Sequence, residues 1–228
     1  MAVVEGGTSA SIAEVGNAAA LPLHVTSKPL PVGALGHYRY AGTTGTIAAA
    51  LAANSQLFYV RWTDATRFFV LHKFVARFQC LTPFTANTLT DFGFNLFKAT
   101  AVSAGGGGTD VGALVKTKMR TTMGASLLDV AGAVRLSQTA LLTAVTTLDA
   151  TPIAQSLGDT QSVNPAAATE EARVNDPTLT YVADMANGEY PLVLAQNEGL
   201  VLNNRTVWPA AGTGIVQVEM VWSEVSAF

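Results

Sequence analysis

The run Leu57-Phe-Tyr-Val-Arg-Trp-Thr63 decides the fold class of this chain. Phe58, Val60 and Trp62 recur at every second position, and this period places them on one side of a β-strand. The next run extends from Phe68 to Gln79 and alternates in the same way. Its period puts six residues on one face of a second strand, namely Phe68, Val70, His72, Phe74, Ala76 and Phe78. Both runs therefore predict β-strands.

Further alternating runs follow along the chain. The stretch from Asp91 to Lys98 places Phe92, Phe94 and Leu96 on one face, and with the two runs before it we expect a meander of three consecutive strands. Four strands are predicted near the C-terminus, at 178–184, 190–194, 200–205 and 215–225. The second and third of these flank the turn 195–199, which predicts a hairpin.

These strands indicate an all-β protein. Seven or more strands without an alternation of strands and helices are typical of an antiparallel β-sandwich or jelly roll. We expect residues 37–228 to form this single domain, with long loops around 99–177. The one helix we consider in that region spans Thr139 to Thr147, although its β-branched residues disfavour a helix.

Residues 1–36 have a different composition, rich in Gly, Ala, Ser and Pro. Pro22, Pro29 and Pro31 are spaced so that neither a helix nor a sheet ladder can run through them. We therefore predict an extended N-terminal arm. An arm of this kind is expected to contact neighbouring molecules.

The overall composition favours a subunit of an assembly. Hydrophobic residues make up 49% of the 228 residues and charged residues only 13%, about half the share in typical soluble proteins. A surface with few charges suits burial against other subunits. The net charge of −3 argues against nucleic acid as the partner, and no apolar run approaches the roughly 18 residues that a membrane-spanning helix needs.

Catalytic and metal-binding motifs are not evident. His24, His37 and His72 lack metal-ligand spacing, and Cys80 is the only cysteine. The glycine run 105–108 does not continue into a phosphate-binding loop, since Ala113 stands where that motif has its lysine. We therefore expect no cofactor and no metal, and we predict that the protein is not an enzyme.

Four segments carry a resemblance to a known group of proteins. They are Pro31-Val-Gly-Ala-Leu-Gly-His-Tyr-Arg-Tyr40, Phe92-Gly-Phe-Asn-Leu-Phe-Lys98, Glu189-Tyr-Pro-Leu-Val-Leu-Ala-Gln-Asn-Glu-Gly-Leu-Val-Leu202 and Val216-Gln-Val-Glu-Met-Val-Trp-Ser-Glu224. From about residue 29 to its end the chain resembles virion proteins of tailed bacteriophages. These motifs are strand and turn patterns. The resemblance implies a virion component that is assembled in the cytoplasm of the host bacterium.

The leading hypothesis is a capsid decoration (cement) protein, a homotrimer that binds the major capsid protein or other virion proteins. Aromatic and arginine side chains are enriched at interface cores, so Tyr38, Arg39, Tyr40 and Trp208 are the candidate contacts, with a core or solvated position as the alternative for each. One rival is a structural protein of the tail, neck or fibre attachment. The other is a host-surface or glycan-binding module with Trp208 and Tyr190 as stacking platforms.

Overall fold

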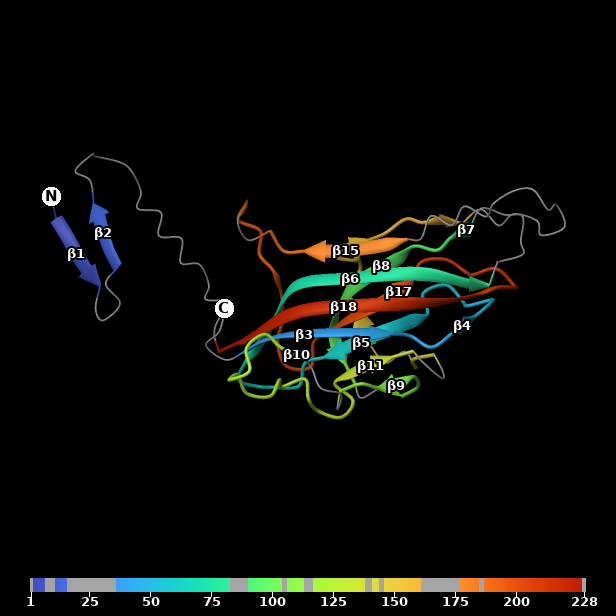
Figure 1. Ribbon diagram of the computed structural model, residues 1–228, viewed down its shortest axis with the longest axis horizontal. Coiled ribbons are helices and arrows are strands. Elements are labelled where there is room, and N and C mark those ends of the chain that lie inside the picture. Colours follow the sequence, from blue (N-terminus) through green and yellow to red (C-terminus); the bar gives the residue numbers. More distant parts are fainter. Residues whose placement is uncertain are drawn as a thin grey trace. The chain divides into compact units, whose positions relative to one another are not determined.

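The architecture comes from a computed structural model, in which two β-sheets pack face to face (Figure 1). The structure describes residues 2–6, 11–15, 36–82, 90–103, 106–112, 117–137, 141–143, 146–160, 177–184 and 187–226. The chain divides into two units, Met1–Leu30 and Pro31–Phe228. Within the described residues, no helix is long and apolar enough to cross a membrane.

The N-terminal unit contains a β-hairpin. Strand β1 (Ala2–Gly6) pairs antiparallel with β2 (Ser11–Val15), so that Ala2 lies opposite Val15 and Gly6 opposite Ser11. The three prolines of the predicted arm lie outside the described residues. The arm therefore carries a secondary structure that the sequence analysis did not predict.

The first sheet of the larger unit is called here the β18 sheet, after its central strand. Its order is β10-β3-β18-β6-β15, with β16 also paired to β6 and β4 to β18, and Figure 1 shows the long strands side by side. The bounds are β3 (Gly36–Thr43), β4 (Ile47–Ala48), β6 (Phe68–Thr82), β10 (Thr117–Lys118), β15 (Thr178–Val182), β16 (Leu192–Leu194) and β18 (Thr213–Val225).

The second sheet is called the β17 sheet. Its order is β12-β8-β17-β5-β11-β9, with β13 also paired to β8, while β14 and β7 form a separate pair. The bounds are β5 (Gln56–Arg61), β7 (Thr90–Asp91), β8 (Phe94–Val102), β9 (Thr109–Asp110), β11 (Val134–Leu136), β12 (Thr146–Leu148), β13 (Ala154–Gln155), β14 (Asp159–Thr160) and β17 (Gly199–Asn204). Both sheets are antiparallel throughout. The predicted antiparallel β-sandwich is confirmed.

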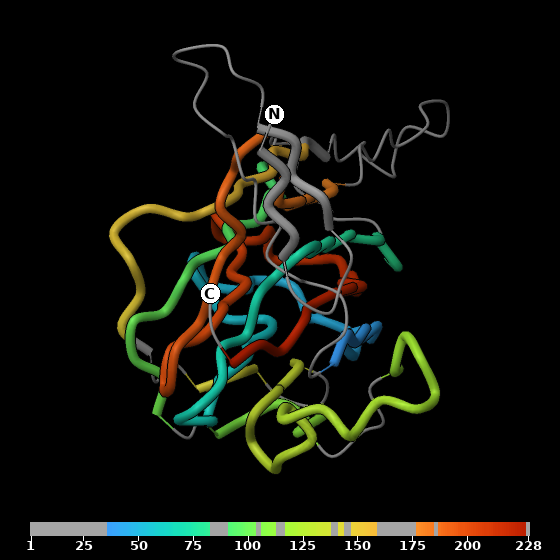
Figure 2. The backbone as a smooth tube through the Cα atoms, turned by 90° about the vertical axis from the view of Figure 1, so that its left-hand side faces the viewer, coloured from blue at the N-terminus to red at the C-terminus, as the bar shows by residue number. Residues whose placement is uncertain are grey.

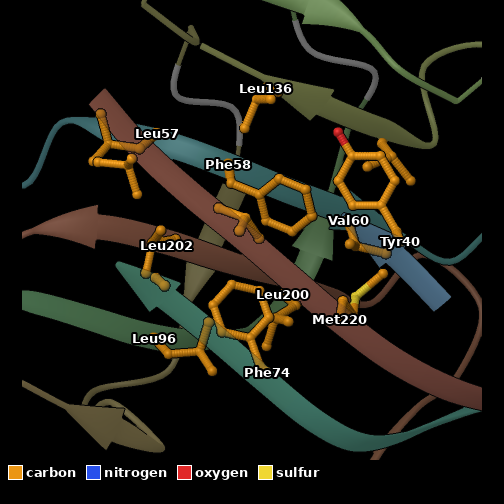
Figure 3. Packing of buried hydrophobic residues seen from close by; sticks show 14 of the residues in the cluster. Tyr40, Leu57, Phe58, Val60, Phe74, Leu96, Leu136, Leu200, Leu202 and Met220 are labelled. Atoms are coloured by element: carbon orange, nitrogen blue, oxygen red, sulfur yellow. The ribbon is translucent and has the colours of Figure 1, made fainter. Parts of the chain in front are cut away.

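The predicted meander is wrong, because the three early strands do not neighbour one another. Strand β6 belongs to the β18 sheet, whereas β5 and β8 lie on either side of β17 in the other sheet. Their aromatic faces meet across the sandwich instead, and the rings of Phe58 and Phe74 are 5.8 Å apart (Figure 3). A strand buries its apolar face equally well in either layer, so alternation predicts the strand but not its partners.

The predicted inner face of β6 is correct for only half of the strand. The pairing of β6 with β18 shifts register, because Val221 lies opposite Lys73 and Trp222 opposite Leu71. His72 is therefore the extra residue of a β-bulge. Phe69 and Leu71 enter the core before the bulge, and Phe74, Ala76 and Phe78 enter it after the bulge. Val70 and His72 consequently belong to the outer face.

The helix considered over residues 139–147 does not form where the structure describes this segment. Thr146 and Thr147 begin β12, which pairs with β8, and Leu142 forms a bridge with Gly107. Leu142 and the partly buried Leu148 pack on Tyr59 and Val201, which makes a small second core on the outer side of the β17 sheet. Sheet pairing and this apolar contact outweigh the weak helix propensity of the segment.

Candidate interaction surface

Two of the four predicted contact residues lie in the interior. Tyr38 and Tyr40 come from the inward-facing positions of β3 and are buried. The Tyr38 hydroxyl donates to the carbonyl oxygens of Gly124 (3.2 Å) and Ala125 (3.3 Å), and its ring stacks on Trp222. Tyr38 thereby holds the loop between β10 and β11, which is drawn in yellow-green at the lower right of Figure 2.

Trp208 is also an interior residue, with 1% of its surface exposed. Its ring lies 5.1 Å from that of Phe78 and 5.5 Å from that of Phe92. Core packing therefore explains Tyr38, Tyr40 and Trp208, and their burial corrects the prediction that these side chains contact a partner. Of the two aromatics expected to form a glycan platform, Trp208 is buried and only Tyr190 is exposed (87%).

Arg39 is the one predicted contact residue that reaches the surface. It lies between Tyr38 and Tyr40 on β3, so alternation directs its side chain to the opposite face of the sheet, where about half of it is exposed. Its role as a contact residue stays a prediction. Its neighbours on that face define the surface described next.

The outward-facing residues of β3, β18, β6 and β15 form one surface, which we call the open face. The strand registers arrange it in three rows of four. The rows are Arg39, Val221, Lys73 and Val182; Ala41, Glu219, Val75 and Thr180; and Thr43, Gln217, Arg77 and Thr178. Every position except the buried Val75 is partly or fully exposed. The open face thus has Glu219 and Val75 at its centre, and apolar and polar side chains are mixed around them.

The open face has a positive charge on a protein whose net charge is −3. It holds three cations and one carboxylate. Arg39 Nη2 and Arg77 Nη1 each donate to the Glu219 carboxylate at 3.3 Å, so one acid bridges three strands. Lys73 adds a further cation at the bulge. This arrangement favours a partner that presents carboxylates.

Two histidines, His37 on β3 and His72 on β6, lie at one end of the outer face of the β18 sheet. The Nε2 atom of His72 lies 2.8 Å from the Ser223 hydroxyl, and the rings of His37 and His72 are 5.2 Å apart. Burial and the neighbouring His37 lower the pKa of His72 to about 4, and burial lowers that of His37. Both imidazoles are thus neutral at pH 7. Ser223 is 1% exposed, so its hydroxyl serves internal bonding here.

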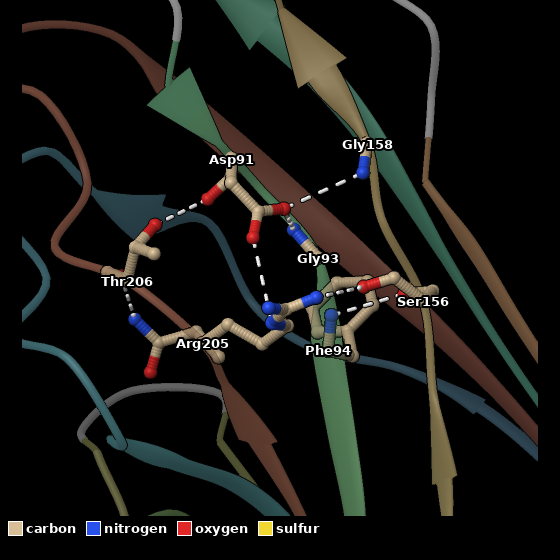
Figure 4. Close-up of polar contacts among 8 residues, drawn as sticks. Asp91, Gly93, Phe94, Ser156, Gly158, Arg205 and Thr206 are labelled. Atoms are coloured by element: carbon tan, nitrogen blue, oxygen red, sulfur yellow. Dashed lines mark hydrogen bonds and ion pairs between the residues drawn. The ribbon is translucent and has the colours of Figure 1, made fainter.

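A second polar cluster joins three segments of the β17 sheet, at the start of β8 and the ends of β13 and β17 (Figure 4). One Asp91 oxygen accepts the backbone N–H of Gly93 (2.7 Å), and the other forms an ion pair with Arg205 at 3.4 Å. Arg205 also donates to the Ser156 carbonyl oxygen, while the Ser156 hydroxyl accepts the N–H of Phe94. These hydrogen bonds and the ion pair hold the three segments together.

Glu224 is a buried carboxylate that the sequence analysis missed. It accepts hydrogen bonds from the Ser126 hydroxyl (2.7 Å), the Leu127 backbone N–H (3.0 Å) and the Trp222 indole (3.3 Å). Burial raises its pKa despite these bonds, which act in the opposite direction. The alternation of β18 contained a signal for it, because position 224 continues the inward series of Met220 and Trp222. Glu224 fixes the loop that Tyr38 also holds.

The polar clusters of the described residues therefore hold loops to the sandwich. The open face is the candidate surface for binding a partner. Within the described ranges, no three His, Cys, Asp or Glu side chains are grouped as metal ligands. Comparison of the chain with protein-family models, curated proteins and solved structures finds no match.

Proposed function

We propose that this chain is a structural protein of a tailed-bacteriophage virion, and specifically a decoration (cement) protein that binds the outside of the shell. The observation that carries the proposal is the open face, a largely exposed and charged surface on a braced β-sandwich. The resemblance of the strand and turn motifs to virion proteins supports the same function. No cofactor or catalytic step is needed for this role.

The two units have separate roles in this proposal. The sandwich supplies a rigid body, because its core aromatics are interlocked and its loops are braced by ion pairs and buried hydrogen bonds. The N-terminal unit supplies an attachment segment that holds the major capsid protein or another virion protein. Arg39, as an exposed arginine on the open face, contributes to the subunit contacts.

The test is the copy number and location of the protein on purified particles, measured by quantitative gel analysis and particle imaging. Hundreds of copies distributed over the shell are the expected result. A few copies at one vertex would replace the decoration role with a place in the neck, tail or fibre attachment. Absence of the protein from the particles would overturn the proposal as a whole.

The N-terminal unit gives a second test. Deletion of residues 1–32 is expected to reduce binding to particles depleted of this protein, while the sandwich keeps its circular dichroism spectrum and melting temperature. The deletion removes the hairpin unit, Met1–Leu30, and ends before β3. Unchanged occupancy of the deletion variant on particles would contradict the role of the arm.

A further inference from the structure

We infer that copies of this protein associate through an uncharged surface at one end of the sandwich, which we call the apolar end. Its exposed residues are Ala48, Ala50, Ala52, Ala53, Val207 and Ala210. The inference deepens the proposed function, on which it rests, because it names the surface through which the subunits of the decoration protein contact one another.

The apolar end is formed by two connections between the sheets. Residues 44–55 lead from β3 in the β18 sheet to β5 in the β17 sheet, and residues 205–212 lead back from β17 to β18. Both connections lie at the end of the sandwich where β4 is labelled in Figure 1. The sequence contains no Asp, Glu, Lys or Arg within 40–60 or within 206–218. The exposed residues of this end therefore carry no charge.

Reciprocal backbone hydrogen bonds join the two connections. The N–H of Ala50 donates to the carbonyl oxygen of Pro209 at 2.7 Å, and the N–H of Trp208 donates to that of Leu51 at 2.9 Å. The side chains of Leu51 and Trp208 are buried in the core. The exposed residues beside these anchors are thus held in one arrangement, so little conformational entropy is lost when they enter an interface.

The backbone of Ala50 is an unusual feature of the apolar end. Its φ of 58° lies in the left-handed region, where a Cβ atom is disfavoured and glycine is the usual residue. Ala50 is exposed and does not belong to the core. Its methyl group therefore adds conformational strain without adding core packing, and it enlarges the exposed apolar surface.

The absence of charge indicates that a second copy of this chain covers the apolar end. Subunits around a symmetry axis present the same residues to one another near that axis, so a charge there would approach a charge of the same sign. The apolar end avoids this repulsion. The open face does not, since it holds Arg39, Lys73 and Arg77 but only one carboxylate, Glu219. Exposed apolar residues gathered on one surface are also typical of a protein contact.

Sedimentation equilibrium of the full chain tests the inference. The wild type is expected to be oligomeric, and its association should persist at about 1 M salt, because screening of charges does not weaken an apolar contact. Val207→Glu brings like charges together at the contact and is expected to weaken association at least about tenfold. Val130→Glu is the matched control, since Val130 is a similarly exposed valine outside the apolar end (47%, against 58% for Val207), and association is retained.

A mixing experiment separates a direct contact from a general effect of charge. Val207→Glu and Val207→Lys are each expected to associate weakly alone, and an equal mixture of the two is expected to associate more strongly, because opposite signs then meet. All three variants should keep the melting temperature of the wild type, since both positions are exposed. A monomeric wild type, equal behaviour of Val207→Glu and Val130→Glu, or a mixture no stronger than its components would overturn the inference.

These results are distinguishable from those that test the proposed function. Self-association is measured on purified protein, whereas the virion role is measured by copy number on particles. An oligomer that is absent from particles would leave the inference standing and remove the proposed function. Particles decorated by monomers, with attachment lost in Val207→Glu, would overturn the inference and assign the apolar end to the contact with the shell.

Discussion

The two faces of the β18 sheet share the same strands but hold different kinds of residue. On β18, the inward Val216, Val218, Met220 and Trp222 are buried, whereas Gln217 and Glu219 face outward and are exposed or half-buried. The inner face stabilises the fold through buried apolar area, at about 25 cal/mol per Å². The outer face has ion pairs that contribute little to stability. The comparison shows that the direction of its side chains divides one sheet into a buried apolar face and a largely exposed face that carries charges.

The largest expected effect comes from removing an inner aromatic. Trp222→Ala is expected to lower the free energy of unfolding by about 3–5 kcal/mol, because the ring packs on both Tyr38 and Phe69 and its loss leaves a cavity. Urea denaturation measures the change. The control is Tyr190→Ala, at an exposed position where the expected change is within about 0.5 kcal/mol. Equal losses from both variants would contradict the comparison.

The buried carboxylate on the inner side comes next. Glu224→Ala leaves the Ser126 hydroxyl, the Leu127 N–H and the Trp222 indole without their acceptor, which is expected to cost about 1–3 kcal/mol. Hydrogen exchange in residues 119–133 should increase more than in β5. Glu224→Gln is the matched variant, since its amide oxygen can still accept, and it should lose less stability. A loss from the glutamine variant as large as that from alanine would contradict this account.

The pair of His37 and His72 predicts that the stability of the fold depends on pH. The pKa of His72 is lowered to about 4 in the folded protein, from 6.5 in the unfolded chain. The unfolded state therefore binds more protons between these values, and stability is expected to fall as the pH is lowered from 6.5 toward 4. His37, whose pKa is also lowered, acts in the same direction.

Melting temperatures across this pH range measure the effect. The raised pKa of Glu224 acts in the opposite direction, because the folded state then binds the additional proton, and stability from this group falls as pH rises. His72→Gln should flatten the decline below pH 6.5. A decline that is identical in the wild type and this variant would exclude His72 as its source.

The smallest effect is expected on the open face. Glu219→Gln removes the negative charge that pairs with Arg39 and Arg77, whose side chains are about half exposed, and the expected loss of stability is below about 1 kcal/mol. Salt near 1 M should reduce the difference between wild type and variant. Denaturation at two salt concentrations measures both quantities. A loss comparable to that of Trp222→Ala would mean that the outer face also stabilises the fold.

Sequence patterns predicted the strands better than their arrangement. Alternation identified β5, most of β8 and the inward series of β18, because it reflects burial on one side of a strand. It did not predict that β6 leaves its chain neighbours for the opposite sheet, since pairing depends on contacts between distant segments. The bulge at His72 was also not predicted, because the sequence analysis assumed strict alternation along the strand.

The site residues were harder to predict for a related reason. An aromatic side chain is favoured both in a core and in an interface, so residue type alone could not separate Tyr38 and Trp208 from surface contacts. Alternation in β3 does separate Arg39 from its two tyrosine neighbours. The proximity of Lys73 and Glu219 could not be predicted, because it depends on the register of β6 and β18. This register brings positions about 150 residues apart into neighbouring rows.

The bulge at His72 in β6 marks a position where this protein can tolerate a change in chain length. The strand holds one residue more than its partner β18 at His72. Deletion of His72 alone would leave Phe69 and Leu71 in strict alternation with Phe74 and the residues after it, so both halves of the strand would keep their inward side chains. Deletion of Val75 would instead turn one half of the strand inside out. Natural relatives that differ in length within this strand are therefore expected to differ at His72 or at Leu81, where the pairing with β18 shifts register a second time.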